Sequence, residues 1–211
     1  MTQASHHDHE IRPANQRRRI WMLQSGAAAC LLLVVFSRPA IVETSMAHEF
    51  VETIGVALIL VAVFGRLWSI LYIGSRKNAE LVTSGPYSIT RNPLYLFSTI
   101  GAIGIGLVFG SIIIALVLGT LSYAILAHTA SKEATYLHSV FGAAYRSYAV
   151  RTPMIWPKLS LYRDQIEPTF SPATLRRTFV DCLFFLAIYP LIEGLEYLQV
   201  SGNLPTALWL Y

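Results

Sequence analysis

Long apolar runs separated by shorter polar segments dominate the pattern of this 211-residue chain. The runs cover residues 20–36, 50–73, 94–130 and 179–198. The second run is interrupted by Arg66, and the third is long enough for two helices, with Gly110-Ser111 as the natural place for a tight reversal. Because a helix needs roughly 20 apolar residues to cross the hydrocarbon core of a bilayer, the pattern predicts about five transmembrane helices, including a helical hairpin.

The composition supports a membrane protein rather than a soluble one. Hydrophobic residues make up 54% of the chain and charged residues only 13%, and the mean hydropathy is +0.50. One soluble core cannot absorb this much apolar surface. Cys30 and Cys182 both lie inside apolar runs, which argues against a disulfide framework. We therefore expect an all-α, polytopic integral membrane protein.

The distribution of basic residues predicts the orientation. If the N-terminus is cytoplasmic, every one of the 16 Lys and Arg residues except Arg38 and Arg66 falls on the cytoplasmic side, as the positive-inside rule requires. The net charge of +4 is then explained by topology. The charges flank apolar runs and form no compact patch with interleaved aromatics, so we expect no nucleic-acid partner.

The same pattern divides the chain into four parts. They are a cytoplasmic tail at 1–19, two spans at 20–73, a core at 74–157 with the hairpin and two polar segments, and a connector with the last span at 158–211. His6, His7 and His9 lie in the tail without other fixed ligands, so no metal site is expected. Function is sought in the polar segments at 75–93 and 131–177, because the second is unusually long for a connector.

The first polar segment carries the features of an anion site. Gly85-Pro86 marks a turn. Asn92 is expected to cap the third span and Pro93 to be its first helical residue, so free N–H groups of the helix start would favour an anion. Arg91 adds a guanidinium that can hold a carboxylate with two parallel hydrogen bonds. The alternative is equally open: Arg91 would be a membrane anchor and Asn-Pro a simple cap.

The second polar segment predicts an amphipathic helix. Apolar and aromatic residues recur there at spacings of four, four and three, at Leu137, Phe141, Tyr145 and Tyr148. Such a stripe more often packs a helix against its neighbours than lines a cofactor pocket. Glu133 and Arg151 bracket the stripe close to the membrane, and they are the less ordinary residues of this segment.

Together, the two segments resemble the isoprenylcysteine carboxyl methyltransferase family, which is similar to the membrane phospholipid N-methyltransferases. The resemblance covers residues 69–157 and rests on Gly85-Pro86-Tyr87, Arg91-Asn92-Pro93-Leu94-Tyr95, Glu133 and the stripe that ends before Arg151. It implies a small helical membrane fold in which cytoplasmic loops enclose S-adenosylmethionine. It also implies a lipophilic or prenylated substrate that enters from the bilayer.

The resemblance assigns roles to particular residues. It implies cofactor binding by Gly85, Pro86, Tyr87, Arg91, Asn92, Pro93, Tyr95, Glu133 and Tyr145. Glu133 and Arg151 are the candidate catalytic residues, with Arg151 orienting an anionic group of the substrate. Two departures from the family pattern stand out, since Asn92 replaces a His and Ala134 replaces a Glu. Asn cannot titrate near neutral pH as His does, which puts an acid or base role at position 92 in doubt.

Three functions remain open at this point. Carboxyl O-methylation of an isoprenylcysteine-like substrate is favoured, because an amine substrate would need a general base and the sequence offers only Glu133 or a tyrosine. A phospholipid or lipid-amine N-methyltransferase is the second possibility. A catalytically inactive membrane protein of the same fold is the third. The sequence predicts no oligomeric state.

Overall fold

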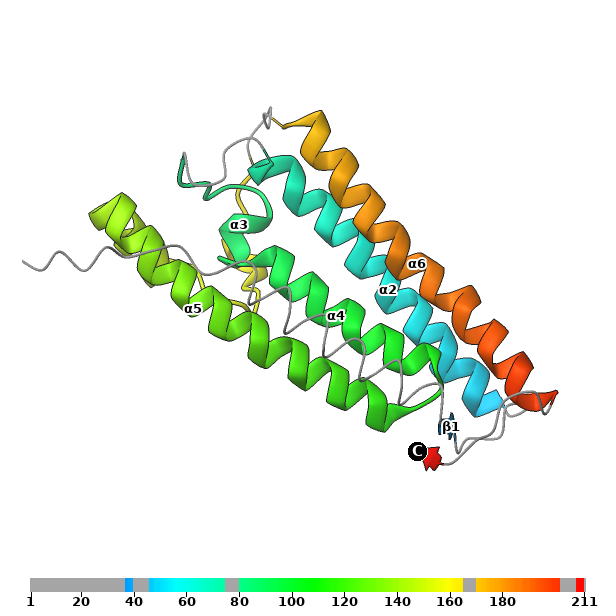
Figure 1. Cartoon of the computed structure of the whole chain (residues 1–211). Coiled ribbons are helices and arrows are strands. Elements are labelled where there is room, and N and C mark those ends of the chain that lie inside the picture. The colour runs from blue at the N-terminus through cyan, green and yellow to red at the C-terminus, as the bar shows by residue number, and fades with distance from the viewer. Residues whose placement is uncertain (1–36, 40–45, 75–79, 165–169, 202–207, 211) are drawn as a thin grey trace, which may run out of the picture.

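The computed structural model of the chain describes residues 37–39, 46–74, 80–164, 170–201 and 208–210. Its elements are, in order, β1 (Ser37–Pro39), α2 (Met46–Ile73), α3 (Pro86–Ile89), α4 (Pro93–Val108), α5 (Ile112–Arg151), η1 (Leu159–Leu161), α6 (Pro172–Val200) and β2 (Leu208–Leu210). The four long helices lie side by side, with α4 between α2 and α5, and with α6 packed against α2 (Figure 1). The predicted all-α fold is confirmed. The expected tail at 1–19 and first span at 20–36 lie outside the described residues.

Three helices in the described part of the chain are long and apolar enough to cross a bilayer. They are α2, α5 and the portion Pro172–Leu195 of α6. The apolar helix α4 has 16 residues, which corresponds to about 24 Å and is shorter than a full span. The sequence analysis placed the helix starts too late, at residues 50 and 179, because polar residues at a membrane surface can extend a helix beyond its apolar part.

The predicted hairpin is formed by α4 and α5. Gly110 adopts a left-handed conformation with φ 71° between the two helices, a conformation that favours glycine. The Ser111 hydroxyl then accepts a hydrogen bond from the Ile114 N–H at 3.2 Å and caps α5. The reversal therefore occurs at Gly110-Ser111, as expected.

Helix α5 is longer than the sequence indicated. It runs to Arg151, so the amphipathic helix predicted in the segment from residue 131 onwards is present and continues directly from the apolar part of α5 without an intervening loop. Gly142, with φ 51° and ψ −121°, interrupts the helical backbone between the apolar part and the last turns. The strands β1 and β2, which the sequence did not predict, pair in parallel over three residues each.

Glycines let α4 approach both of its neighbours closely. A Cβ atom added at Gly104 would lie 2.9 Å from the carbonyl oxygen of Gly55 in α2. One added at Gly106 would lie 2.3 Å from the Cα of Ala115 in α5. No side chain fits at such distances, so the small residues set the spacing of these three helices, as at many helix contacts in membranes.

The intramembrane residue Arg66 points into the bundle. Its Nη1 donates a hydrogen bond to the Ser98 hydroxyl of α4, and its Cζ lies 5.8 Å from the centroid of the Phe185 ring in α6. The charge is thus held between helices rather than facing lipid.

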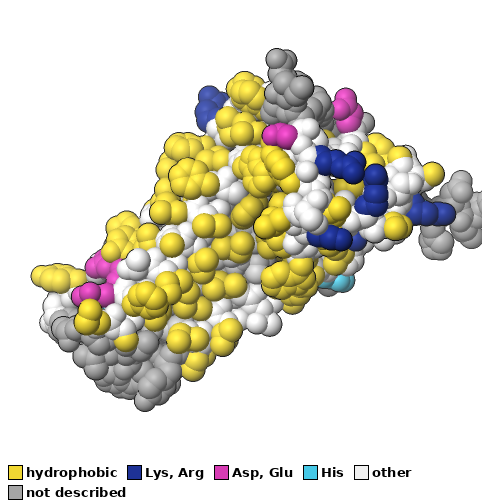
Figure 2. Space-filling model, turned by 180° about the vertical axis from the view of Figure 1, so that it is seen from behind, with side chains coloured by type: hydrophobic (Ala, Val, Ile, Leu, Met, Phe, Trp, Pro, Cys, Tyr) yellow, Lys and Arg dark blue, Asp and Glu magenta, His cyan; other side chains and the backbone are white. Residues whose placement is uncertain are grey.

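The outward faces of the helices are apolar. Phe64, Leu116 and Phe184 are each more than 60% exposed, at 67%, 64% and 69%. Figure 2 shows apolar side chains over the middle of one face and Lys and Arg side chains gathered near one end. A large exposed apolar surface is stable in lipid, and the chain is an integral membrane protein.

Candidate functional site

The two polar segments that the sequence singled out meet along a seam, formed by residues 89–92 and 153–158. Four hydrogen bonds cross it at 2.9 Å, each to a backbone carbonyl: from the Arg91 N–H to Pro153, from the Lys158 N–H to Ile89, from the Thr90 hydroxyl to Ile155 and from the Asn92 amide to Met154. The seam fixes the backbone on both sides of Arg91. It also places the start of α4 beside the segment that follows α5.

Asn92 occupies the N-cap position as predicted, but its side chain does not cap the helix. Helix α4 begins at Pro93, and the Asn92 side chain makes no capping hydrogen bond because its amide donates across the seam to Met154. The N–H groups of Tyr95 and Leu96 donate to the Asn92 carbonyl at 3.1 Å. The start of α4 therefore has fewer unbonded N–H groups for an anion than the sequence indicated. The Arg91 guanidinium is the stronger anion-binding group.

The Arg91 guanidinium is half-buried and only partly engaged. Its Nη1 donates to the Tyr145 hydroxyl at 3.2 Å. Its Nε is buried and has no hydrogen-bond partner among the described residues. A buried N–H without an acceptor costs free energy, and Nε lies on the guanidinium edge that can hold a carboxylate with two parallel bonds. The Arg91 Nε–H is thus a buried donor whose hydrogen bond an anionic group would supply.

A buried tyrosine cluster lies beside Arg91. The Tyr148 hydroxyl donates to the backbone carbonyl of Tyr87 at 2.7 Å, which joins α5 to α3. The Tyr145 and Tyr148 rings meet edge to face with centroids 6.2 Å apart. Tyr145 and Tyr148 of the predicted stripe therefore pack the last turns of α5 against its neighbours and bring the Tyr145 hydroxyl to Arg91, whereas Leu137 and Phe141 lie before the interruption at Gly142.

Glu133 acts on the same cluster electrostatically. Burial raises the pKa of the Tyr87 phenol well above its ordinary value of 10.0. Three neighbours add to the rise in this pKa: Tyr148, Tyr95 and Glu133. The carboxylate of Glu133 is thus close enough to Tyr87 to disfavour a second negative charge there.

Gly85 and Pro86 build the turn before Arg91. Gly85 has φ 58°, and an added Cβ atom would lie 2.4 Å from the Tyr72 ring. Its N–H donates to the Arg163 carbonyl at 2.7 Å. Pro86, which is buried, begins α3. The structure gives both residues a clear structural role in positioning the chain, while their predicted contact with a cofactor stays a prediction.

Arg151 is exposed, unlike the buried groups around Arg91. It is the last residue of α5, its side chain is exposed, and its Nε donates to the Ser147 carbonyl at 3.3 Å within the same helix. Its proposed contact with a substrate stays a prediction.

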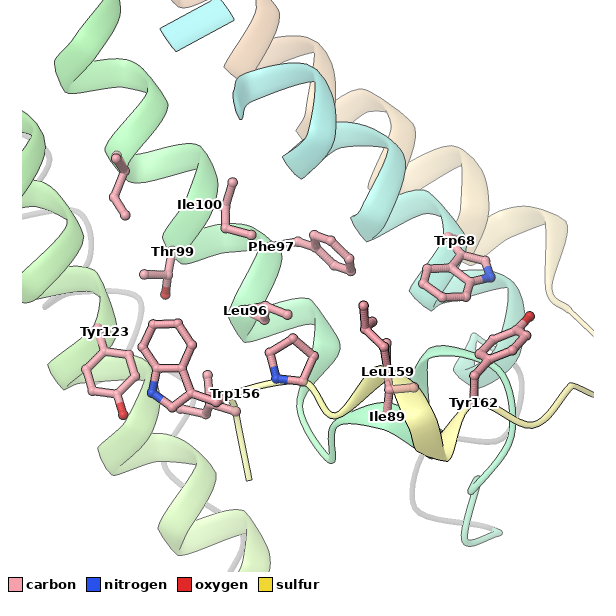
Figure 3. Close-up of a pocket in the computed structure, with 13 residues that line it drawn as sticks. Trp68, Ile89, Leu96, Phe97, Thr99, Ile100, Tyr123, Trp156, Leu159 and Tyr162 are labelled. Atoms are coloured by element: carbon pink, nitrogen blue, oxygen red, sulfur yellow. The ribbon is translucent and has the colours of Figure 1, made fainter. Parts of the chain in front are cut away.

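A cavity of about 680 Å³ borders the seam. Leu96, Phe97 and Ile100 of α4 line it, together with Ile89 and Ile155 of the seam (Figure 3). Its lining is almost entirely apolar, and its volume is typical of a site for a small organic ligand. The cavity therefore offers an apolar compartment next to the polar groups around Arg91.

The sequence analysis missed the residues that bound this cavity. Two aromatic pairs, Trp68 with Tyr162 and Tyr123 with Trp156, each have ring centroids 6.1 Å apart and line the cavity. Each pair joins one helix to the segment after α5. Trp156 could be recognised in the sequence as an aromatic residue near a membrane surface, but its partner could not.

Comparisons with known proteins give the chain relatives over most of its length. It is 36% identical over 152 residues to the cobalt-zinc-cadmium resistance protein CzcN of Cupriavidus metallidurans, covering 72% of this chain and 70% of that protein. It is 34% identical over 154 residues to the nickel-cobalt-cadmium resistance protein NccN of Alcaligenes xylosoxydans xylosoxydans, covering 73% of this chain and 72% of that protein. No solved structure shows a significant match.

Two further matches concern methyltransferases. The family model described as phospholipid methyltransferase matches residues 50–144, which include α4 and Arg91. The protein-S-isoprenylcysteine O-methyltransferase of Schizosaccharomyces pombe is 29% identical over 83 residues, covering 38% of this chain and 35% of that enzyme. The chain therefore belongs to the same family as CzcN and NccN, and its match to the phospholipid methyltransferase model and its partial similarity to the yeast enzyme fit an isoprenylcysteine carboxyl methyltransferase-like protein.

Proposed function

We propose that this protein is an S-adenosylmethionine-dependent methyltransferase that methylates a carboxylate on a lipophilic substrate. The observation that carries the proposal is the half-buried guanidinium of Arg91, whose Nε has no hydrogen-bond partner among the described residues. The membership of a methyltransferase family supports the reaction type. The apolar cavity beside the seam supports a substrate with a large hydrocarbon part.

The described residues around Arg91 fit the charges of the cofactor. S-adenosylmethionine, when bound, supplies a methyl group activated by a sulfonium. The Nε edge of Arg91 can hold its carboxylate. Glu133, which contributes to the raised pKa of Tyr87, is the acidic group that we propose for its ammonium. Tyr87, Tyr95 and Tyr145 provide aromatic surface around these charges, and aromatic faces attract cations.

The residues of the chain then act by positioning and by excluding water. Methyl transfer is an in-line displacement, so holding the reactants in the correct geometry supplies much of the rate enhancement. Tyr145 holds the Arg91 guanidinium through its hydroxyl, and the seam holds the Arg91 backbone. Arg151 is proposed to orient the substrate carboxylate. A carboxylate is already ionised at neutral pH, so no general base is required.

A lipid amine is the second candidate substrate. The match of residues 50–144 to the phospholipid methyltransferase model favours it. An amine must lose a proton to react, so this reaction needs a base, and Glu133 is the candidate because it lies near the buried tyrosines. The two reactions differ in their products, since a methyl ester is labile to base and an N-methyl group is stable.

The proposal also places the site on the cytoplasmic side of the membrane. The basic residues of the described chain cluster around this end: Lys132, Arg146, Arg151, Lys158, Arg163, Arg176 and Arg177 lie in the second half of α5, in the segment after it and at the start of α6. The positive-inside rule assigns such an end to the cytoplasm. CzcN and NccN are named as metal-resistance proteins, and on that ground we propose that this chain methylates a membrane component during growth under toxic metal.

Two measurements test the proposed function. Calorimetric titration of S-adenosylmethionine into the purified protein in lipid nanodiscs should show saturable binding. Incubation of the protein with membranes and methyl-labelled S-adenosylmethionine should give a labelled lipid whose label is released by mild base. A base-stable label would establish the amine reaction instead. Absence of both binding and labelling would favour a catalytically inactive protein of the same fold.

A further inference from the structure

The segment that follows α5 crosses the bundle as a strap, defined here as residues 155–162. At one end of the strap, Trp156 pairs with Tyr123 of α5. At the other end, Tyr162 pairs with Trp68 of α2. Figure 3 shows the two pairs at opposite ends of the cavity, with side chains of α4 between them. The cavity therefore has an α5 end and an α2 end.

The α2 end is fixed by a carboxylate that accepts two hydrogen bonds. The Tyr162 hydroxyl donates to Oδ2 of Asp164 at 2.9 Å, and the Tyr72 hydroxyl of α2 donates to Oδ1. A tyrosine phenol is protonated at neutral pH and can donate, and the bond with Asp164 is the largest cause that raises the pKa of Tyr162 further. Asp164 thus clamps the Tyr162 ring to α2 in the orientation that lines the cavity.

The same clamp is tied to the turn that precedes Arg91. The Arg163 N–H donates to the Ser88 hydroxyl at 3.0 Å, and the Gly85 N–H donates to the Arg163 carbonyl at 2.7 Å. The Tyr72 ring lies where a side chain at position 85 would be. Movement of Tyr162 is therefore resisted by backbone contacts as well as by Asp164.

The direction in which a substrate lies follows from the positions of the polar groups. The Arg91 N–H bonds to the Pro153 carbonyl and the Asn92 amide to the Met154 carbonyl, and these acceptors lie just before Trp156 at the α5 end of the cavity. A substrate whose reacting group is near Arg91 is therefore expected to enter the cavity at its α5 end. Its hydrocarbon part then extends along α4 toward Trp68 and Tyr162. Lipid is the surrounding solvent of these helices, and an apolar chain is the occupant that an almost wholly apolar lining accepts without unpaired polar groups.

We propose that Tyr162, positioned by Asp164, closes the α2 end of the cavity and limits the length of the hydrocarbon tail that the protein accepts. This inference rests on the proposed function, because it takes the tail to belong to the methylated lipid. Tyr162 is a specificity-determining residue in this proposal, and Asp164 is a positioning residue that acts through it. Neither was singled out by the sequence.

The test uses straight-chain fatty acids of increasing length, each brominated either at its terminal carbon or next to its carboxylate. Bromine quenches tryptophan fluorescence at short range, and Trp68 and Trp156 mark the two ends of the cavity. The full chain is studied in nanodiscs, with Trp21 and Trp209 replaced by Phe, and with either Trp68 or Trp156 replaced as well. Unbrominated fatty acid serves as the competitor, which separates saturable binding from partitioning into the bilayer.

With Tyr162 intact, we expect affinity, expressed relative to fatty acid dissolved in the bilayer, to be maintained up to a limiting length and to fall for longer chains, which the closed α2 end excludes. Near that length, terminal bromine should quench Trp68, and bromine next to the carboxylate should quench Trp156. Tyr162→Ala should move the limit to longer chains, so that chains beyond the original limit bind about tenfold tighter. Tyr162→Phe and Asp164→Asn should move it in the same direction by less, because the ring remains but the clamp is weakened.

Tyr197→Ala is the matched control, since Tyr197 is 74% exposed on α6 and this change should leave the limit unaltered. The inference is overturned if Tyr162→Ala leaves the limit in place, or if terminal bromine quenches Trp156 instead of Trp68. It is also overturned if no quenching is saturable, as expected if the predicted span at 20–36 fills the groove. Should Tyr162→Ala fail to fold, Tyr162→Phe and the position of quenching decide the matter.

Titration of S-adenosylmethionine into the same preparations separates the two proposals. Binding of S-adenosylmethionine with a length limit that ignores Tyr162 would remove the inference about the tail and leave the proposed function. If the protein binds no S-adenosylmethionine but the length limit moves when Tyr162 is replaced, the proposed function is removed and the role of Tyr162 in limiting the tail length remains.

Discussion

Substitution of Arg91 is the most direct test of the candidate site. The Nε edge of its guanidinium is buried without a partner in the described structure, and two parallel hydrogen bonds to a carboxylate would occupy it. A hydrogen bond to a charged group contributes about 1.5–3 kcal/mol. Arg91→Gln removes the charge and should weaken S-adenosylmethionine binding by about 3 kcal/mol, or about 100-fold. Arg91→Lys keeps a charge without the planar fork and should weaken it about tenfold.

The assay is calorimetric titration of S-adenosylmethionine in nanodiscs, with thermal unfolding of each variant measured in parallel. Arg146→Gln is the matched control, because Arg146 follows Tyr145 in α5 and is exposed. Its binding constant should be unchanged. Tyr145→Phe removes the hydroxyl that accepts from Nη1 and should weaken binding less than Arg91→Gln, by about 0.5–1.5 kcal/mol.

The reasoning about Arg91 is refuted by a specific pattern of results. If folded Arg91→Gln binds S-adenosylmethionine as tightly as the unsubstituted protein, the guanidinium does not hold the cofactor. If Arg146→Gln weakens binding equally, the effect comes from the net charge of this end of the molecule and not from a defined contact.

Three further predictions concern stability and can be measured by unfolding in nanodiscs. Gly85→Ala should cost more than the about 1–3 kcal/mol expected for a strained backbone alone, because its Cβ would lie 2.4 Å from the Tyr72 ring, whereas Gly142→Ala, with φ 51° and open space, should cost only the strain. Tyr148→Phe should cost about 1–3 kcal/mol by leaving the buried Tyr87 carbonyl without its donor; an unchanged stability would contradict this. Because the pKa of Tyr87 is raised in the folded state, its contribution to stability is present below pH 10.0 and is lost as the pH rises above it. Tyr87→Phe should therefore flatten the alkaline loss of stability.

The helices could be predicted from the sequence because a bilayer imposes simple requirements. Apolar runs of sufficient length identify α2, α5 and α6, and Gly110-Ser111 supplies both the left-handed residue and the cap that a reversal needs. The amphipathic stripe predicted the helix at the end of α5, but not that this helix would continue directly from the apolar part with an interruption at Gly142. Its last turns are amphipathic and follow Gly142, a residue that normally ends a helix, yet the helical hydrogen-bonding pattern resumes beyond it.

Contacts between side chains and residues distant in sequence were harder to predict than the position of a residue within its helix. The sequence correctly placed Asn92 at the N-cap, but the amide turned to a carbonyl that lies 62 residues later in the chain. The preference of Asn for the N-cap reflects hydrogen bonds to nearby backbone N–H groups. In this fold the Met154 carbonyl, which is distant in sequence, binds the Asn92 amide instead. The clamp of Tyr162 by Asp164 was missed for the same reason, since Tyr72 reaches that carboxylate across 92 residues.

The turn at Gly85 changes how the Gly85-Pro86-Tyr87 motif should be understood. As a sequence, the motif pointed to cofactor contacts. In the structure, Gly85 leaves room for Tyr72 and bonds to Arg163, while the Tyr87 backbone carbonyl accepts from Tyr148 of α5. The motif thus links the clamp at the α2 end of the cavity with the tyrosines beside Arg91. If the proposed tail site and the proposed cofactor site are both correct, this short turn with a partner on each side would keep them at a fixed separation, as an in-line methyl transfer requires.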